Sequence, residues 1–206
     1  ASAAVRRNVI GMLADQAMRS NFELMNSLGF YGDKLSGIPG IYGNAFITKA
    51  AMANDWKISG TITAAQMYQN LVTIYNAIKT VTNNVISPDT CLIAPALYNI
   101  MDTTIFNTFN GTTVRQQFEG AQNVKVISTP ELAGTALTAG TGTANLKDSL
   151  FMFKNIESFI SPIVSNWFEM KPPQAIDLRY ETICPSGFGG VVIRQPMGCY
   201  IANNAT

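Results

Sequence analysis

The sequence contains no histidine and few charged residues of either sign. Of its 206 residues, 14 are Lys or Arg and 13 are Asp or Glu, so the net charge is +1. Without histidine the chain lacks the commonest general base and metal ligand, and no Ser–His or Cys–His pair can form. The balanced charge does not support a nucleic-acid binder or membrane-surface protein that relies on electrostatics. Because charged residues make up only 13% of the chain, against about 25% in typical soluble domains, we expect partners to cover much of its surface.

Cysteines and long apolar runs are also scarce. The three cysteines, Cys91, Cys184 and Cys199, lie far apart and form no C-x-x-C pair. This spacing excludes a disulfide framework and favours buried free thiols in a reducing compartment. No apolar run approaches the roughly 20 residues that span a bilayer, and no secretory signal is visible, so we expect no membrane association.

The first stretch, residues 2–28, predicts one long helix. Apolar residues recur at spacings of three and four and form a stripe along the helix. The stripe is broad enough to predict that the helix is covered on more than one side. Gly29 is expected in the left-handed position that ends the helix. About 26 residues would extend roughly 40 Å, which is too long for a small lobe to cover by itself. Since the chain opens at Ala1 and has no acidic residue before Asp15, we expect a processed chain or one that starts upstream.

The rest of the chain mixes helix and strand signals. Helices are expected over residues 61–84, from Pro95 to Met101 and around residues 114–118, and strands over residues 90–94, 124–128 and 150–153. Within the longest of these helices the expected buried face is Met67, Leu71, Ile74, Tyr75 and Ile78. Residues 133–147 indicate a surface loop or the tip of a β-ribbon. Residues 159–170 receive no assignment.

The strongest β signal lies near the end of the sequence. Residues 175–183 alternate between apolar and polar side chains, which predicts a single strand with one buried face. Residues 185–190 are expected to turn this strand into a returning strand over residues 191–195, which would form a β-hairpin with a loop longer than two residues.

No arrangement of residues predicts catalysis. The carboxylates are scattered, and the glycine-rich segment 31–44 matches neither phosphate-binding spacing. Its aromatic neighbours, among them Tyr31, Tyr42 and Trp56, are expected in the core rather than stacked on bases. We therefore expect no catalytic, cofactor-binding or metal-binding residues and no cofactor. A small α/β enzyme with its site around residues 31–42 stays open as an alternative.

Three blocks of sequence, in order along the chain, resemble one family. They are Phe30-Tyr31-Gly32-Asp33 through Gly37-Ile38-Pro39-Gly40-Ile41-Tyr42, then Ser87-Pro88-Asp89-Thr90 through Tyr98, and finally Tyr180-Glu181-Thr182-Ile183 with Gly189-Gly190-Val191 through Pro196. Together with the long helix they resemble the major capsid proteins of tailed bacteriophages with the Hong Kong 97 fold.

The resemblance implies an α+β fold with a spine helix and a long β-sheet in a peripheral domain, and an inserted α/β axial domain. The expected division is residues 1–57 for the spine helix and glycine-rich turn, 58–155 for the axial domain, and 156–206 for the return to the peripheral sheet. Charged residues near the helix, turn and hairpin are the expected contacts between subunits: Arg6, Arg7, Asp33, Lys34, Arg179, Glu181 and Arg194.

The resemblance also implies partners and a location. Subunits of this family form pentamers and hexamers of an icosahedral shell around double-stranded DNA, which they contact non-specifically. Portal, scaffold or cement proteins are further partners, and the shell is assembled in the cytoplasm of the bacterial host. A protein-filled compartment of the encapsulin type is the main alternative within the same fold.

Overall fold

The computed structural model describes residues 2–33, 35–57, 62–134, 147–176 and 179–205, and for residues 2–10, 175–176 and 179–180 the description is confined to the backbone. The helices are α1 (Ser2–Tyr31), α2 (Ala64–Val81), α3 (Pro95–Thr103), α4 (Val114–Gln122) and the short 3-10 helices η1 (Pro130–Leu132) and η2 (Pro196–Gly198). The strands are β1 (Gly32–Asp33), β2 (Ile38–Pro39), β3 (Thr48–Ala51), β4 (Thr90–Ile93), β5 (Ile105–Asn107), β6 (Thr112–Thr113), β7 (Lys125–Ser128), β8 (Ser149–Phe153), β9 (Ile160–Asn166), β10 (Gln174–Ile176), β11 (Arg179–Glu181), β12 (Gly187–Ile193) and β13 (Cys199–Asn203).

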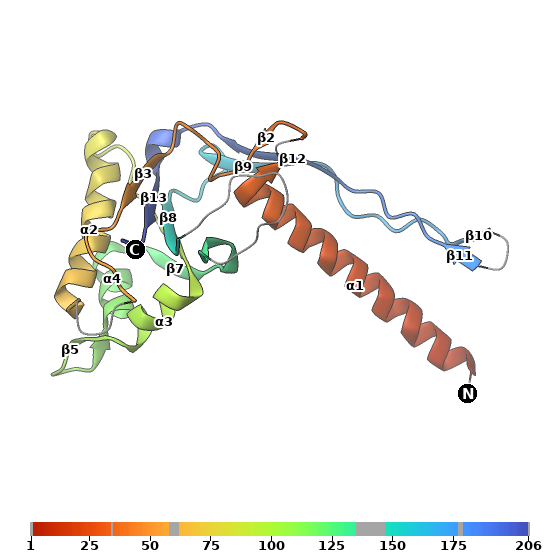
Figure 1. Cartoon of the computed structure of the whole chain (residues 1–206), viewed down its shortest axis with the longest axis horizontal. Helices are drawn as coiled ribbons and strands as arrows, with labels where there is room; N and C mark the ends of the chain where they lie inside the picture. The colour runs from red at the N-terminus through yellow and green to blue at the C-terminus, as the bar shows by residue number, and fades with distance from the viewer. Residues whose placement is uncertain (1, 34, 58–61, 135–146, 177–178, 206) are drawn as a thin grey trace.

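The molecule consists of a compact body and two long projections (Figure 1). The body contains α2, α3, α4 and a five-stranded sheet. The projections are α1 and a β-ribbon formed by β9 and β10 with β11 and β12, which we call the ribbon (residues 160–193). Both projections extend to the same side, where the N-terminus and the β10–β11 tip lie.

The five-stranded sheet has the order β3-β13-β8-β4-β7. β13 pairs in parallel with β3 and antiparallel with β8. β4 lies between β8 and β7, and it pairs antiparallel with β8 and parallel with β7. Because β3 and β13 belong to this sheet, it includes residues on both sides of the expected axial segment 58–155. The domain division itself stays a prediction. Side chains that are less than 2% exposed fill the space between the sheet and the helices: Trp56, Leu71, Ile78, Ile93, Leu97, Met101, Phe118, Leu132, Leu150, Phe151, Met152 and Ile201.

Local sequence signals explain the helices of the body. Thr63 and Thr113 each begin a helix with a capping box, in which the threonine hydroxyl accepts from the backbone N–H three residues on, in Gln66 and Gln116 respectively. The side-chain oxygen of each glutamine accepts a hydrogen bond from the backbone N–H of the capping threonine. Two backbone N–H donors are thus satisfied at the N-terminus of each of these helices. All five residues of the expected face of α2 are buried, which confirms that prediction. α4 extends to Gln122, beyond the expected end at Phe118.

The predicted strand over residues 175–183 is wrong. β10 and β11 are two short strands that pair with each other, with Gln174 opposite Glu181 and Ile176 opposite Arg179. The return strand β12 pairs instead with β9, in the segment that received no assignment. A hairpin is present, but its turn falls within the expected strand rather than at residues 185–190. The apolar–polar alternation of the sequence runs through both β10 and β11 without a break, so periodicity alone does not show where one strand ends and the next begins.

The predicted end of the first helix is also corrected. α1 continues through Gly29 to Tyr31, and the left-handed residue is Gly32, with a φ of +74°. A Cβ on Gly32 would lie 2.2 Å from the Ile38 carbonyl oxygen, so only glycine fits there. Gly29 is instead a contact point, where an added Cβ would meet Val191 of the ribbon at 3.3 Å.

Two further expectations concern the cysteines and a loop. Cys91 and Cys199 are buried free thiols as expected, whereas Cys184 is partly exposed. The expected loop over residues 133–147 lies mostly outside the described residues, because the structure describes only residues 133, 134 and 147 of it.

Candidate assembly surface

The middle of α1 has little cover within its own chain. None of the side chains from residue 11 to residue 24 is buried, and among the described side chains of the helix the first that is buried is Met25. Apolar side chains at Met12, Leu13 and Leu24 are more than half exposed. The sequence predicts cover on more than one side of this helix, and the single chain does not supply it. Apolar helix surface without cover is typical of a surface that binds a partner.

The ribbon shows the same property. Its outer half, residues 165–174 and 182–186, contains no buried side chain. Its two strands are joined there by backbone hydrogen bonds from the Glu169 N–H to the Pro185 carbonyl and from the Lys171 N–H to the Ile183 carbonyl. The large apolar side chains of α1 and the ribbon, each 41–65% exposed, form what we call the apolar surface: Met12, Leu13, Met18, Phe22, Leu24, Ile163, Trp167, Met170 and Ile183.

A groove separates the outer parts of the two projections. Leu13, Ala14 and Ala17 of α1 line one wall, and ribbon residues including Met170, Pro172 and Cys184 line the other. Its volume is about 790 Å³, which is room for many water molecules at roughly 30 Å³ each. The Asn21 amide donates to the Ser186 hydroxyl at 2.6 Å near its inner end. The helix and the ribbon therefore lie side by side without a shared core.

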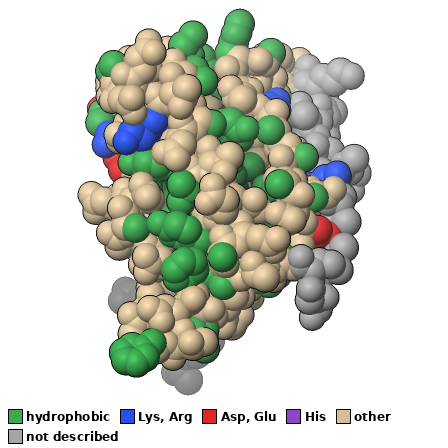
Figure 2. Space-filling model, turned by 90° about the vertical axis from the view of Figure 1, so that its left-hand side faces the viewer, with side chains coloured by type: hydrophobic (Ala, Val, Ile, Leu, Met, Phe, Trp, Pro, Cys, Tyr) green, Lys and Arg blue, Asp and Glu red, His purple; other side chains and the backbone are tan. Residues whose placement is uncertain are grey.

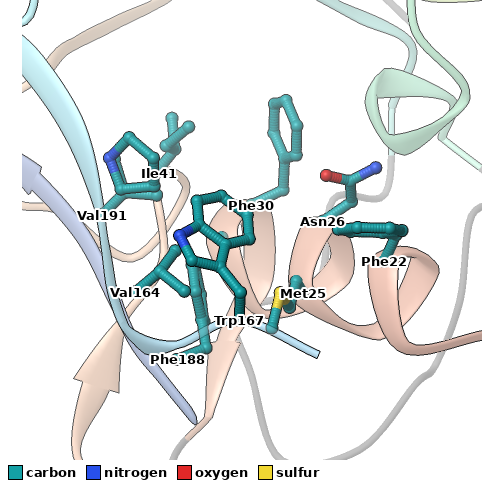
Figure 3. Close-up of a pocket in the computed structure, with 11 residues that line it drawn as sticks. Phe22, Met25, Asn26, Phe30, Ile41, Val164, Trp167, Phe188 and Val191 are labelled. Atoms are coloured by element: carbon teal, nitrogen blue, oxygen red, sulfur yellow. The ribbon is translucent and has the colours of Figure 1, made fainter. Parts of the chain in front are cut away.

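A smaller pocket lies where the two projections meet the body. Figure 3 shows Phe22, Met25 and Phe30 approaching from α1, and Val164, Phe188 and Val191 from the ribbon, with the Trp167 indole between them. The pocket has a volume of about 200 Å³, and apart from the Asn26 amide its labelled side chains are apolar. A space of this size accepts one aromatic or branched side chain, since a cavity of about 150 Å³ binds benzene.

The glycine-rich turn fixes the direction in which α1 leaves the body. The Tyr31 ring stacks on Tyr42 with centroids 5.7 Å apart, and its hydroxyl donates to the Glu131 carbonyl of η1. The N–H groups of Ile41 and Tyr42 donate to the carbonyls of Gly29 and Phe30 at the end of the helix. Burial, together with nearby Glu131, raises the pKa of Tyr31 to about 12. The two tyrosines at the ends of the expected enzyme site are thus buried structural residues.

The structure does not bring the expected contact residues together. Asp33 is used within the turn, where its carboxylate accepts from the N–H groups of Leu35 and Ser36. The Arg194 guanidinium donates to the Glu157 carbonyl and the Ser161 hydroxyl of its own chain. Glu181 is on β11 near the ribbon tip. Lys34 lies outside the described residues, and the side chains of Arg6, Arg7 and Arg179 are not described. Their role between subunits stays a prediction.

The sequence predicts that the long helix lacks cover, but it does not predict the ribbon residues that belong to the apolar surface. The long first helix was identified as too large to be covered, but Trp167 and Met170 lay in the segment without an assignment. A tryptophan and a methionine close together in a stretch without strand periodicity were the available signal for an exposed apolar surface in this segment.

Charged side chains of the body mostly form local pairs. Arg115 bonds the Asp102 and Glu119 carboxylates at 2.6 and 3.0 Å, and Lys57 and Lys154 pair with Asp148 and Asp89. The face of the body in Figure 2 shows only a few charged groups, with apolar side chains in several separate patches. Among the described residues, no three His, Cys, Asp or Glu side chains are placed to hold a metal ion.

The buried thiols are poorly suited to nucleophilic chemistry. Burial raises the pKa of Cys91 to about 12, with a contribution from Glu119, and burial alone raises the pKa of Cys199 to about 12. A thiol with such a pKa is almost entirely protonated at neutral pH. None of the helices in the described parts of the chain is both long and apolar enough to cross a bilayer.

Comparison with known proteins identifies relatives. The model of the family described as "Major capsid protein" matches residues 2–203. The capsid of Myoviridae phage XM1 is similar in structure, with a TM-score of 0.79 at 12% identity over 96% of this chain and 65% of that one. A protein of Mycobacterium phage Ogopogo matches with a TM-score of 0.58 at 14% identity, over 97% of this chain and 69% of that one.

A third structure is similar over a smaller part of the chain. The virus-like particle from Pyrococcus furiosus has a TM-score of 0.56 at 14% identity, over 79% of this chain and 58% of that one. The chain thus spans about two thirds of the length of the XM1 capsid protein. No curated protein matches the sequence. The predicted α+β fold of the Hong Kong 97 type is confirmed.

Proposed function

Because the chain belongs to the family of major capsid proteins, we propose that it assembles through its apolar surface into pentamers and hexamers of an icosahedral shell that encloses double-stranded DNA. The observation that carries the proposal is the exposure of large apolar side chains along α1 and the ribbon. The family is structural and not enzymatic, and nothing in the site requires a cofactor.

The extent of the apolar surface supports an interface of ordinary size. Nine side chains that are 41–65% exposed present on the order of 900 Å² when each is about 200 Å² in full. The largest apolar patch of a typical monomer is about 300–600 Å², and a standard interface buries about 800 Å² on each partner. The summed apolar area is therefore adequate for contact with neighbouring subunits.

The division of labour within the subunit follows from the same geometry. We assign the peripheral role to α1 and the ribbon (within residues 1–57 and 156–206) and the axial role to the body (58–155, extended by β3 and β13). Arg194, which is exposed, and the charged residues near the ribbon tip would contact neighbours beside the apolar surface. Portal, scaffold or cement proteins would join such a shell in the virion, after assembly in the cytoplasm of a bacterial host.

Particle mass tests the proposal. The purified chain is examined by light scattering and electron microscopy, and its contents are examined after nuclease treatment. Megadalton, roughly spherical particles that protect double-stranded DNA would support the capsid assignment. The same particles filled with one host protein would favour the encapsulin-type alternative, and a stable monomer or dimer at high concentration would contradict both.

A pair of variants tests whether the apolar surface carries the assembly. Trp167→Asp places a charge on the apolar surface, and we expect at least a tenfold rise in the concentration needed for particles, because burying an unpaired charge is unfavourable. Phe109→Asp is the matched control, since Phe109 is 99% exposed at the β5–β6 turn and lies outside the apolar surface. Equal effects of the two substitutions would contradict the assignment.

A further inference from the structure

We infer that the outer part of α1 (residues 11–24) and the outer half of the ribbon (residues 165–174 and 182–186) become stably ordered only when a second copy of this chain covers them. The inference rests on the proposed assembly and specifies how that assembly is controlled. The subunit would enter the shell with a folded body and two projections that fold fully on contact.

The ribbon provides the first argument. Over its outer half the described residues form a two-stranded ribbon, which contacts α1 through the Asn21–Ser186 hydrogen bond, and none of their described side chains is buried. An isolated two-stranded hairpin is at best marginally stable in water, because its backbone hydrogen bonds replace equivalent bonds to water and no core is formed. Pairing alone therefore does not hold the outer ribbon in one conformation.

The helix provides the second argument. No side chain of residues 11–24 is buried as a whole, so this part of α1 depends mainly on intrinsic helix propensity. Gly11 lowers that propensity, and the exposed Arg19–Glu23 pair adds little to it. The ribbon beside the helix does not supply a core either, since the groove of about 790 Å³ keeps the two apart.

The body provides the contrast. Leu71, Ile93, Leu97, Met101 and Phe118 are all fully buried, and β4 and β8 are paired on both sides. Local unfolding free energies range from near zero to the global value within one protein, according to how much each part buries. The body lies at the high end of this range and the projections lie at the low end.

A second copy is the occupant that the size of the surface favours. The roughly 900 Å² of exposed apolar side chains matches the area that one partner of a standard interface buries. Ordering on contact consumes part of the association free energy, so it raises the concentration of subunits that is needed for shells to form.

Two glycines offer a matched test. Gly11 lies in the exposed part of α1 and Gly120 lies in α4 of the body, and an added Cβ at either position meets no atom within 4 Å. Gly→Ala raises helix propensity equally at both. If α1 folds on assembly, Gly11→Ala lowers the free-energy cost of forming the helix. The critical concentration for particles then falls about fivefold. Gly120→Ala leaves that concentration unchanged, because α4 is already folded in the free subunit.

Hydrogen exchange of the full chain, measured by mass spectrometry, gives the direct readout. In free subunits we expect amides of residues 11–24, 165–174 and 182–186 to exchange at least 100-fold faster than in particles. Amides of β4 and β8 should exchange slowly in both states. Equal protection of α1 and β8 in free subunits, or a critical concentration unaffected by Gly11→Ala, would overturn the inference while leaving the capsid proposal intact. Failure of the chain to form particles at any concentration would overturn both.

Discussion

The body and the two projections have different sources of stability although they belong to one chain. In the body, helices and sheet enclose a continuous set of buried side chains, so its packing is complete within the subunit. Along α1 and the ribbon, large apolar side chains face solvent, and the space between these elements is a groove rather than a core. The comparison shows that one chain can contain regular elements with a complete core and regular elements whose apolar side chains lack one.

The largest effect is expected from a change inside the body. Phe118→Ala removes a fully buried ring that meets Tyr68 edge-on at 6.5 Å, so we expect a loss of about 3–5 kcal/mol in the free energy of unfolding. Urea unfolding of free subunits measures this loss. Phe109→Ala, which truncates a 99% exposed ring, should stay within about 0.5 kcal/mol. Similar losses for the two variants would remove the distinction between body and surface.

A smaller effect is expected at the junction of the two regions. Gly32→Ala forces a side chain into left-handed backbone and places its Cβ 2.3 Å from the Gly40 nitrogen. We expect a loss of at least about 2 kcal/mol, together with fewer particles because α1 leaves the body in a different direction. Gly37→Ala is the control, since Gly37 has a φ of +68° but open space around it. Thermal unfolding of both variants would show whether the close approach adds to the backbone strain.

Acid should weaken the body through Asp89. Burial by itself raises the pKa of this carboxyl, but bonds from the Asn155 N–H, Lys154 and the Thr90 hydroxyl outweigh it and lower the pKa. A lowered folded-state pKa stabilises the protein above about pH 4, the unfolded value, and this contribution is lost as the pH falls through the folded value.

Asp89→Asn should therefore reduce the free energy of unfolding at neutral pH by about 0.5–1 kcal/mol. The difference from the unsubstituted chain should shrink as the pH falls from about 4 through the lowered pKa of Asp89 in the folded state, because protonation makes both side chains neutral. Unfolding curves of both proteins, measured from neutral to acidic pH, test whether the difference in the free energy of unfolding shrinks on acidification. A difference that grows on acidification would contradict the assignment.

The smallest effect is expected on the exposed face of α1. Arg19 and Glu23 form an ion pair at 3.0 Å with both side chains largely in solvent. Glu23→Gln should change the free energy of helix formation by less than about 0.5 kcal/mol, and added salt should remove the change. Circular dichroism at low and high salt measures it. A large effect would mean that α1 has internal support that the burial pattern does not reveal.

The sequence predicts the body better than the projections because local signals determine the body. Thr63, Gln66 and the buried face of α2 follow from capping chemistry and helical period, and both are visible in one segment. The position of the ribbon turn is set by which distant strand β12 pairs with, and β9 carries a proline and no clear alternation. The exposure of Trp167 depends on the direction in which two projections leave the body, which no local pattern encodes.

The position of β13 has a consequence for the order in which the protein is made. This strand comes last among the strands in the sequence, yet it lies between β3 and β8 and joins them. On the ribosome, β3 therefore has no neighbour until residues 199–203 have emerged, and the sheet closes only after the ribbon has been synthesised. A product truncated before residue 199 would lack the strand that joins β3 to β8, so its sheet would be left without β3 at that edge.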